Sequence, residues 1–194
     1  MKTIVFCVVF LYGANGFLFP KVKTVDKLDL NKYLGRWYEV YSSLIQRQTF
    51  QRNSVCTTAT YKLKSDGNVN VFNAGITKTA KGAPFNATGT AVPVKGEAGK
   101  FIVNFDVAPF KTTSPNYLVI KLGPETHGKD GLYEYTVIST PRKALVWVLA
   151  RNAKQFKAKY DAEVRQYLEK NGFTWFWNKP HPTYQGDDCV YPPM

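Results

Sequence analysis

The sequence between residues 36 and 151 consists of short runs in which apolar and polar residues alternate, separated by turn-forming residues. The run 55–64 shows this most clearly, and a period of two residues is typical of a β-strand with one buried face. The run ends at Ser65-Asp66-Gly67-Asn68, where glycine supplies the positive φ angle that a tight hairpin turn requires. This pattern predicts an all-β fold whose strands follow one another through hairpins.

Eight such runs occur, in meander order along the chain. We expect strands at residues 36–42, 55–64, 69–77, 85–94, 100–107, 117–122, 132–139 and 144–151. Eight strands in this order suit an antiparallel up-and-down barrel, an all-β architecture. A barrel of this size holds either packed side chains or one small ligand.

A single α-helix is expected to follow the last strand and to pack on the barrel wall. Asn152 is a good N-cap, with Gln155 three residues later, and Gly172 is a typical helix stop. An apolar stripe at helical spacing consists of Phe156, Tyr160, Val164, Tyr167 and Leu168. The tail from residue 173 to residue 194 should then lie along the barrel.

Residues 1–16 are typical of a secretory signal peptide. Lys2 provides the charged start, residues 4–12 the apolar run, and Ala14-Asn15-Gly16 a small-residue cleavage site. The apolar run is too short to span a bilayer, so we expect no transmembrane anchor. The sequence therefore predicts a secreted, extracellular protein with one domain over residues 17–194, and Cys7 is lost with the signal peptide.

The chain is strongly basic, with 26 Lys and Arg against 14 Asp and Glu, a net charge of +12. Removal of Lys2 with the signal peptide leaves 12 − 1 = +11. The basic residues are spread over most of the expected elements, and no nucleic-acid motif occurs. We therefore expect most of these side chains to lie on the solvent-exposed surface, and we expect no nucleic-acid partner. Asn86 begins an N-glycosylation sequon and falls on the outward parity of its strand.

Gly35 and Trp37 open the first expected strand, and Arg151 ends the last. A tryptophan at the floor of a small barrel needs a cover, which a stacked guanidinium group can supply. This pair, with the strands between and the helix after it, resembles the lipocalin family, and within it the branch of apolipoprotein D and the bacterial lipocalins. The resemblance covers roughly residues 25–189. It implies that Gly35, Trp37 and Arg151 form the closed floor of the barrel.

Cys56 and Cys189 are the two cysteines left after the signal peptide. An even number of cysteines in a secreted chain predicts a disulfide. In the branch that the chain resembles, a cysteine of the second strand is bonded to the C-terminal tail, which implies the same pairing here. The segment 121–125 departs from the family because it lacks the usual Thr-Asp-Tyr-like sequence. This departure marks the chain as an outlying member.

A lipocalin-like barrel acts through its cavity, so the inner face of the strands is the expected binding site. Aromatic rings offer contact area at a small cost in side-chain entropy, and hydroxyl or amide groups can orient a polar head group. From strand parity and the resemblance together, we expect the cavity to be lined by Tyr61, Asn73, Phe105, Tyr117, Tyr135 and Trp147.

The expected partner is a small hydrophobic ligand: a fatty acid, bilin, carotenoid, retinoid or sterol. Neither a required cofactor nor a metal is predicted, and the basic charge favours an anionic ligand such as a fatty acid or a bilin. The segment 43–53 should overhang the mouth of the barrel with Leu44, Ile45 and Phe50. Arg47 and Arg52 in this segment could attract a carboxylate.

Three other interpretations compete with the carrier. The resemblance allows an enzyme, because one lipocalin branch acts through a free cysteine in the cavity, but Cys56 falls on the outward parity and is expected to be bonded. His127 and His181 fall in expected loops. An extracellular scaffold would use the basic surface to bind an acidic polysaccharide or a receptor. A cytosolic fatty-acid-binding protein is disfavoured by the signal peptide, the disulfide and the long helix. Nothing in the sequence predicts an oligomeric state.

Overall fold

The computed structural model of the protein describes residues 22–49 and 53–193; the expected signal peptide, Phe50 and Arg52 lie outside the described residues. Within the described residues, an antiparallel sheet curls into a barrel of eight strands in meander order. The barrel strands are β1 (Gly35–Ser43), β2 (Ser54–Leu63), β3 (Val69–Thr77), β4 (Pro84–Pro93), β5 (Lys100–Phe105), β6 (Tyr117–Leu122), β9 (Tyr135–Ser139) and β10 (Val146–Ala150). The barrel closes because β10 also pairs with β1, which places Trp147 opposite Ser42. The predicted fold class is confirmed.

The expected strand 132–139 is divided into two parts. β8 (Leu132–Tyr133) leaves the barrel and pairs with β7 (Glu125–His127), a short strand inside the loop that was expected at 123–131. Between the two parts, Glu134 is buried and its backbone N–H donates to Pro124 O. β5 also ends earlier than expected, at Phe105.

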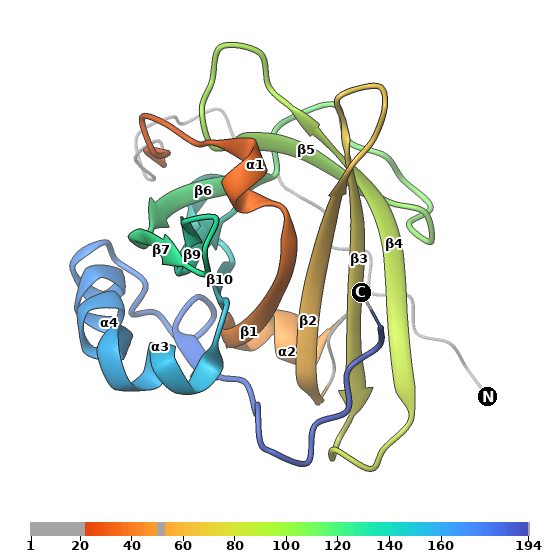
Figure 1. The fold of residues 1–194 in the computed structure, drawn as a ribbon, viewed down its shortest axis with the longest axis vertical. Helices are drawn as coiled ribbons and strands as arrows, with labels where there is room; N and C mark the ends of the chain where they lie inside the picture. Colours follow the sequence, from red (N-terminus) through yellow and green to blue (C-terminus); the bar gives the residue numbers. More distant parts are fainter. Residues whose placement is uncertain (1–21, 50–52, 194) are drawn as a thin grey trace.

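The barrel has a closed end and an open end. α1 (Leu30–Tyr33) lies at the closed end, where β1 begins, and α2 (Leu44–Gln48) follows β1 at the open end. Figure 1 shows these two helices at opposite ends of β1. The open end also carries the loop 106–116 and the 3₁₀ turn η1 (Pro141–Lys143), which joins β9 to β10.

Side chains pack on both faces of the barrel wall. The inner cluster has Trp37 at its base and continues upward through Val71, Ile138 and Leu149. The outer cluster is formed by alternate residues of β9 and β10 together with the helices at the side of the barrel. Both faces of β9 are therefore buried, and none of its five residues is exposed.

The predicted C-terminal helix packs against the barrel wall in two segments. α3 (Ala153–Lys159) begins at Asn152, whose side chain accepts a hydrogen bond from Gln155 N at 2.9 Å. The helix breaks at Tyr160 and resumes as α4 (Asp161–Lys170). The buried residues of the predicted stripe, Phe156, Val164 and Leu168, pack in the outer cluster. Figure 1 shows both helices on one side of the barrel.

The C-terminal tail completes the wall at the open end. β11 (Pro180–Pro182) pairs with residues 41–43 of β1, beyond the point where the β1–β2 ladder ends. The Gln185 side-chain amide then donates to the backbone carbonyls of Glu39 and Thr57, at 2.9 and 2.7 Å. The tail therefore bridges two strands that have separated from each other.

Candidate functional site

The closed end of the barrel is sealed by Trp37 and Arg151. The Arg151 guanidinium carbon lies 3.7 Å from the centroid of the Trp37 ring, which is fully buried. The guanidinium also donates to the carbonyls of Arg36, Leu34 and Lys32 at 2.7, 2.7 and 3.1 Å. Burial lowers the pKa of Arg151 to about 10, so the group remains charged at neutral pH. The predicted stacking of arginine on tryptophan is confirmed.

Gly35 is part of the same floor. Its φ angle is +88°, in the left-handed region where a side chain is strained. A Cβ atom at this position would also lie 3.3 Å from an Arg151 guanidinium nitrogen. The structure thus brings together all three residues of the predicted floor.

Three tyrosines form a hydrogen-bonded cluster directly above the floor. The hydroxyl of Tyr117 lies 2.7 Å from that of Tyr33 and 3.1 Å from that of Tyr61. The rings of Tyr33 and Tyr61 are stacked with centroids 5.8 Å apart, and the Tyr33 hydroxyl also lies 3.2 Å from Thr136 Oγ1. We call Tyr33, Tyr61 and Tyr117 the tyrosine cluster.

Burial keeps these phenols protonated. It raises the pKa of Tyr61 to about 12 and that of Tyr117 well above its usual value. The pKa of Tyr33 is also raised, chiefly by burial. The cluster therefore presents neutral hydroxyl groups that can donate to an acceptor on a ligand. Sequence reasoning missed Tyr33, because it lies before the first strand in a segment with no strand periodicity.

Toward the open end the inner face is apolar and less tightly filled. Phe105, Val103 and Trp147 belong to the inner cluster, yet each remains partly accessible. Trp147 faces inward because it pairs with Ile138, a residue of the inner cluster. Phe105 belongs to the same cluster and pairs with Gly89 on the neighbouring strand. Inward-facing side chains that stay accessible indicate open space inside the wall at this level.

Asn73 also faces inward. It pairs with Ala59 of the inner cluster and shares the face of Val69 and Val71 on β3. Its side-chain oxygen is buried and accepts no hydrogen bond from the residues that the structure describes. A buried amide oxygen without a donor is costly, so a donor from a ligand would be stabilised there. Five of the six predicted lining residues therefore share the inner face: Tyr61, Asn73, Phe105, Tyr117 and Trp147.

Tyr135 does not line the cavity, and its prediction as a lining residue was wrong. It pairs with Ala150 on the outer face, its ring contacts Phe156 and Tyr160, and its hydroxyl donates to Glu163 at 3.1 Å. The helix segments cover this face of β9, so an aromatic residue is buried there as favourably as inside the barrel. Thr136 faces inward in its place.

Arg47 at the mouth is held by the tail. Its guanidinium donates to Pro182 O at 3.1 Å and to Thr183 Oγ1 at 3.3 Å. The Thr183 hydroxyl in turn donates to the buried carboxylate of Glu39 at 2.6 Å. These hydrogen bonds hold the charged group of Arg47 in one position at the rim of the barrel.

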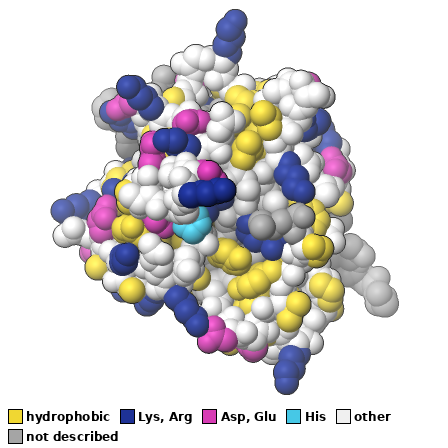
Figure 2. Space-filling model, viewed as in Figure 1, with side chains coloured by type: hydrophobic (Ala, Val, Ile, Leu, Met, Phe, Trp, Pro, Cys, Tyr) yellow, Lys and Arg dark blue, Asp and Glu magenta, His cyan; other side chains and the backbone are white. Residues whose placement is uncertain are grey.

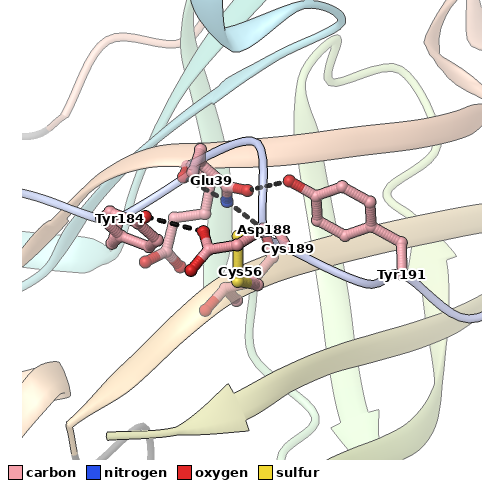
Figure 3. The surroundings of a disulfide bond; sticks show 8 residues. Glu39, Cys56, Tyr184, Asp188, Cys189 and Tyr191 are labelled. Atoms are coloured by element: carbon pink, nitrogen blue, oxygen red, sulfur yellow. Dashed lines mark hydrogen bonds between the residues drawn. A yellow bond between two sulfur atoms is a disulfide. The ribbon is translucent and has the colours of Figure 1, made fainter. Parts of the chain in front are cut away.

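The disulfide Cys56–Cys189 is present, with 5.4 Å between the Cα atoms, as predicted. Figure 3 shows the disulfide below Glu39, with the tail residues Tyr184 and Asp188 on one side and Tyr191 on the other. The backbone N–H of Cys56 donates to Tyr184 O at 2.8 Å, so the tail is also fixed by hydrogen bonds. Both sulfurs are bonded, and neither is a free thiol.

Asn86 is exposed on the outer face of β4, opposite Ala74 of β3. This location is accessible to a glycan, and glycosylation of Asn86 stays a prediction.

The basic side chains visible in Figure 2 are scattered over the surface and do not form one continuous patch. In the described part of the chain no three His, Cys, Asp or Glu residues lie close enough to hold a metal ion. No helix in that part is long and apolar enough to cross a membrane.

Comparison with known proteins agrees with this architecture. A lipocalin-like domain model matches residues 28–176. Temperature-induced lipocalin-1 of Arabidopsis thaliana is 30% identical over 86% of this chain and 84% of its own length. The outer membrane lipoprotein Blc of Vibrio cholerae is 32% identical over 76% of this chain and 78% of its own. Bovine apolipoprotein D is 26% identical over 90% of this chain and 68% of its own length.

The solved structure of insecticyanin from the tobacco hornworm Manduca sexta superposes with a TM-score of 0.62. It covers 89% of both chains at 16% identity, which supports the shared fold. The match of the family model to most of the chain is the stronger finding, because it rests on the sequence itself. With its sealed floor, its meander barrel and its helix against the wall, the chain belongs to the lipocalin family.

Proposed function

We propose that this protein is a secreted carrier that holds one small hydrophobic ligand inside its barrel. Lipocalins bind small hydrophobic ligands. The observation that carries the proposal for this chain is the accessible inner surface around Phe105 and Trp147, above a floor that is fully closed. A cavity with one sealed end and apolar walls excludes water from a ligand while leaving a single route of entry.

The ligand class that we propose is an amphiphile with an apolar body and one polar end that accepts hydrogen bonds, such as a fatty acid or a bilin. Two features support it. The tyrosine cluster offers neutral hydroxyl donors deep in the barrel, and Arg47 offers a fixed positive charge at the rim. Either position can satisfy a carboxylate while the body of the ligand lies against the apolar inner face.

Fluorescence titration tests the carrier function. Fatty acid and biliverdin, added separately, should quench the Trp147 emission at micromolar concentration in the wild-type protein. The quenching should be weaker in Trp147→Phe, in which Trp37 remains at the floor of the barrel. It should be retained in Trp175→Phe, since Trp175 is 61% exposed and lies outside the barrel. If neither compound binds, whether followed by fluorescence or by dialysis, the proposed ligand class is wrong.

Two matched variants locate the polar end of the ligand. Tyr117→Phe removes the hydroxyl at the centre of the tyrosine cluster, while Tyr135→Phe removes one on the outer face. We expect Tyr117→Phe to weaken fatty-acid binding by about tenfold, the value of one hydrogen bond to a charged group, and Tyr135→Phe to leave it unchanged. Equal affinities in both variants would place the polar end at the mouth instead.

Secretion is part of the proposal and rests on the signal-like residues 1–16. Expression of the full chain in a secretory eukaryotic cell should release protein that begins after Gly16. The mass of the released protein should also fall on treatment with an N-glycosidase, and Asn86→Gln should abolish that change. Retention of the intact chain inside the cell would contradict the proposed localisation without affecting ligand binding.

A further inference from the structure

Large aromatic side chains are exposed on the turn that follows α4. Trp175 is 61% and Phe176 71% exposed, whereas Trp177 is partly buried. The rings of Trp175 and Trp177 stack with centroids 5.1 Å apart, and the Phe176 ring meets the Trp177 ring edge-on at 5.0 Å. We call Trp175, Phe176 and Trp177 the aromatic turn. Clustered apolar groups on a surface usually mark an interaction site.

The aromatic turn is held in a defined shape. The backbone N–H of Trp175 donates to Asn178 Oδ1 at 3.0 Å, and the buried Asn178 amide donates to Lys143 O and Gly172 O at 3.0 and 3.2 Å. Phe173, just before the turn, is 2% exposed and packs in the outer cluster. The rings are therefore presented on a rigid support, so that ordering them costs little on binding.

The contacts of the aromatic turn place it at the open end of the barrel. Lys143 belongs to η1, which joins β9 to β10 at that end, and its ammonium group donates to Asn171 O at 2.6 Å. Trp147 lies shortly after η1 on β10 and faces the cavity. Two further exposed apolar residues, Val107 and Phe110, lie in the loop between β5 and β6 at this end.

The surroundings of the turn are basic. Arg142, Lys143, Lys170 and Lys179 flank it, and within residues 22–49 and 53–193 none of them has a carboxylate within 4.0 Å. The sequence contains no Asp or Glu from residue 135 to residue 160, nor from residue 170 to residue 186. Four cations without a neighbouring carboxylate, beside exposed aromatic rings, are complementary to an anionic, partly apolar surface.

We propose that the aromatic turn docks the protein on anionic lipid bilayers, with the open end of the barrel beside the membrane. Tryptophan and phenylalanine rings enter the boundary between head groups and acyl chains, and lysine and arginine are attracted to anionic head groups. The docking itself is independent of the carrier function. Its use, direct transfer of a hydrophobic ligand between membrane and cavity, rests on the proposed function.

An acidic polysaccharide fits the same residues less well. Phe176 carries no hydrogen-bonding group, and its exposed ring gains little from contact with a hydrated sugar chain. Trp175 and Trp177 are stacked on each other, so each has one ring face less to offer a sugar. The acyl boundary of a bilayer, by contrast, stabilises every ring of the turn.

Vesicle flotation measures the docking. The full protein is mixed with vesicles of phosphatidylcholine, either pure or with about 30 mol % phosphatidylserine, to provide the negative surface potential. We expect binding to the anionic vesicles and little to the neutral ones. Trp175→Ala/Phe176→Ala should bind at least about tenfold more weakly, and Arg142→Gln/Lys179→Gln about tenfold more weakly, because each basic side chain contributes to attraction.

Matched controls lie at the closed end. Leu63→Ala/Val92→Ala removes two exposed apolar side chains there, and Lys62→Gln/Lys95→Gln removes two exposed charges. Both should bind the anionic vesicles within about twofold of wild type if the aromatic turn is the contact. Fatty-acid binding in solution should be unchanged in all four variants, which separates a failure of docking from a failure of the carrier function.

Several results would overturn the docking proposal. The proposal is wrong if the wild-type protein does not bind anionic vesicles at low salt. It is also wrong if the aromatic and charge variants bind these vesicles as tightly as the control variants do. Loss of heparin binding in the same variants, without any vesicle binding by wild type, would assign the surface to an acidic polysaccharide. A dimer in sedimentation velocity that the aromatic variant abolishes, again without vesicle binding, would assign it to a second copy of this chain.

Discussion

Arg151 seals the closed end through both its charge and its shape. The planar guanidinium covers the Trp37 ring and satisfies three backbone carbonyls of the chain that enters β1. A lysine could not reproduce both interactions, because its ammonium is a compact point charge. The three carbonyls would lose their donors if the guanidinium were removed.

Arg151→Met should lower the free energy of unfolding by about 3 kcal/mol, since it leaves buried carbonyls without donors. Arg36→Met is the matched control, because Arg36 is less buried and its guanidinium lies at the surface. Urea denaturation of both variants gives the comparison. An equal loss in the two would show that the floor contacts add nothing beyond ordinary side-chain packing.

The tyrosine cluster predicts a loss of stability in alkaline solution. The pKa of Tyr61 is about 12 in the folded protein and ordinarily 10, and the pKa values of Tyr33 and Tyr117 are raised too. A phenol with a raised folded pKa binds its proton more tightly in the native state. Its contribution is therefore complete below pH 10 and is lost as pH rises toward about 12.

Arg151 acts in the opposite sense in the same range, because its folded pKa of about 10 lies below the ordinary 12.5. Arg151 is one group against the three phenols of the tyrosine cluster, and burial also raises the pKa values of Tyr135 and Tyr191. We therefore expect a net loss of stability. Thermal melting should show a falling Tm above pH 10, with a smaller fall in Tyr117→Phe, which removes one of the three phenols. An identical pH profile in wild type and Tyr117→Phe would contradict the assignment.

At the scale of elements, the tail is part of the barrel. β11 pairs with β1, Gln185 bridges β1 and β2, and the disulfide joins positions 133 residues apart in sequence. The tail bridges the gap that opens where the β1–β2 ladder ends, at Tyr38 and Thr58. This gap lies beside the bulge between Val55 and Thr58 in the pairing of β2 with β3. The open end is therefore shaped by residues from both ends of the domain.

Loss of the disulfide should be severe. The chain-entropy model gives about 5 kcal/mol for a loop of this length, so Cys56→Ser/Cys189→Ser should unfold at a much lower urea concentration. Limited proteolysis with chymotrypsin should then cut the tail after Tyr184, which is 50% exposed, before it cuts the barrel. Reduction of the wild-type protein should reproduce both effects. A reduced protein with unchanged stability and an intact tail would show that the backbone pairing of β11 suffices.

For the whole molecule, the proposed carrier predicts one ligand per chain. Native mass spectrometry of protein from its natural source should show a single bound mass that organic extraction removes. The absorption spectrum of the same sample separates a bilin or carotenoid from a colourless lipid. A protein that carries no ligand and does not bind added fatty acid or pigment would contradict the proposed carrier function. That result would favour a scaffold whose barrel is filled by its own side chains.

Local sequence signals determined much of the fold. Alternation and turn residues located the eight barrel strands, and Asn152 located the helix start. These features follow from interactions between residues that are near neighbours in sequence. The floor of Gly35, Trp37 and Arg151 was instead predicted from the resemblance to the lipocalin family. The disulfide could also be predicted, because a single pair of cysteines remains once the expected signal peptide is set aside.

The tertiary structure decided which face of each strand is inside. Alternation shows that two faces differ, but β9 is buried on both faces, so its pattern could not place Tyr135. The bulge in β2, the insertion of β11 and the role of Tyr33 depend on segments far apart in sequence. Contacts of this kind form only when the barrel closes, since the packing of distant segments, not local preference, then sets the lowest free energy.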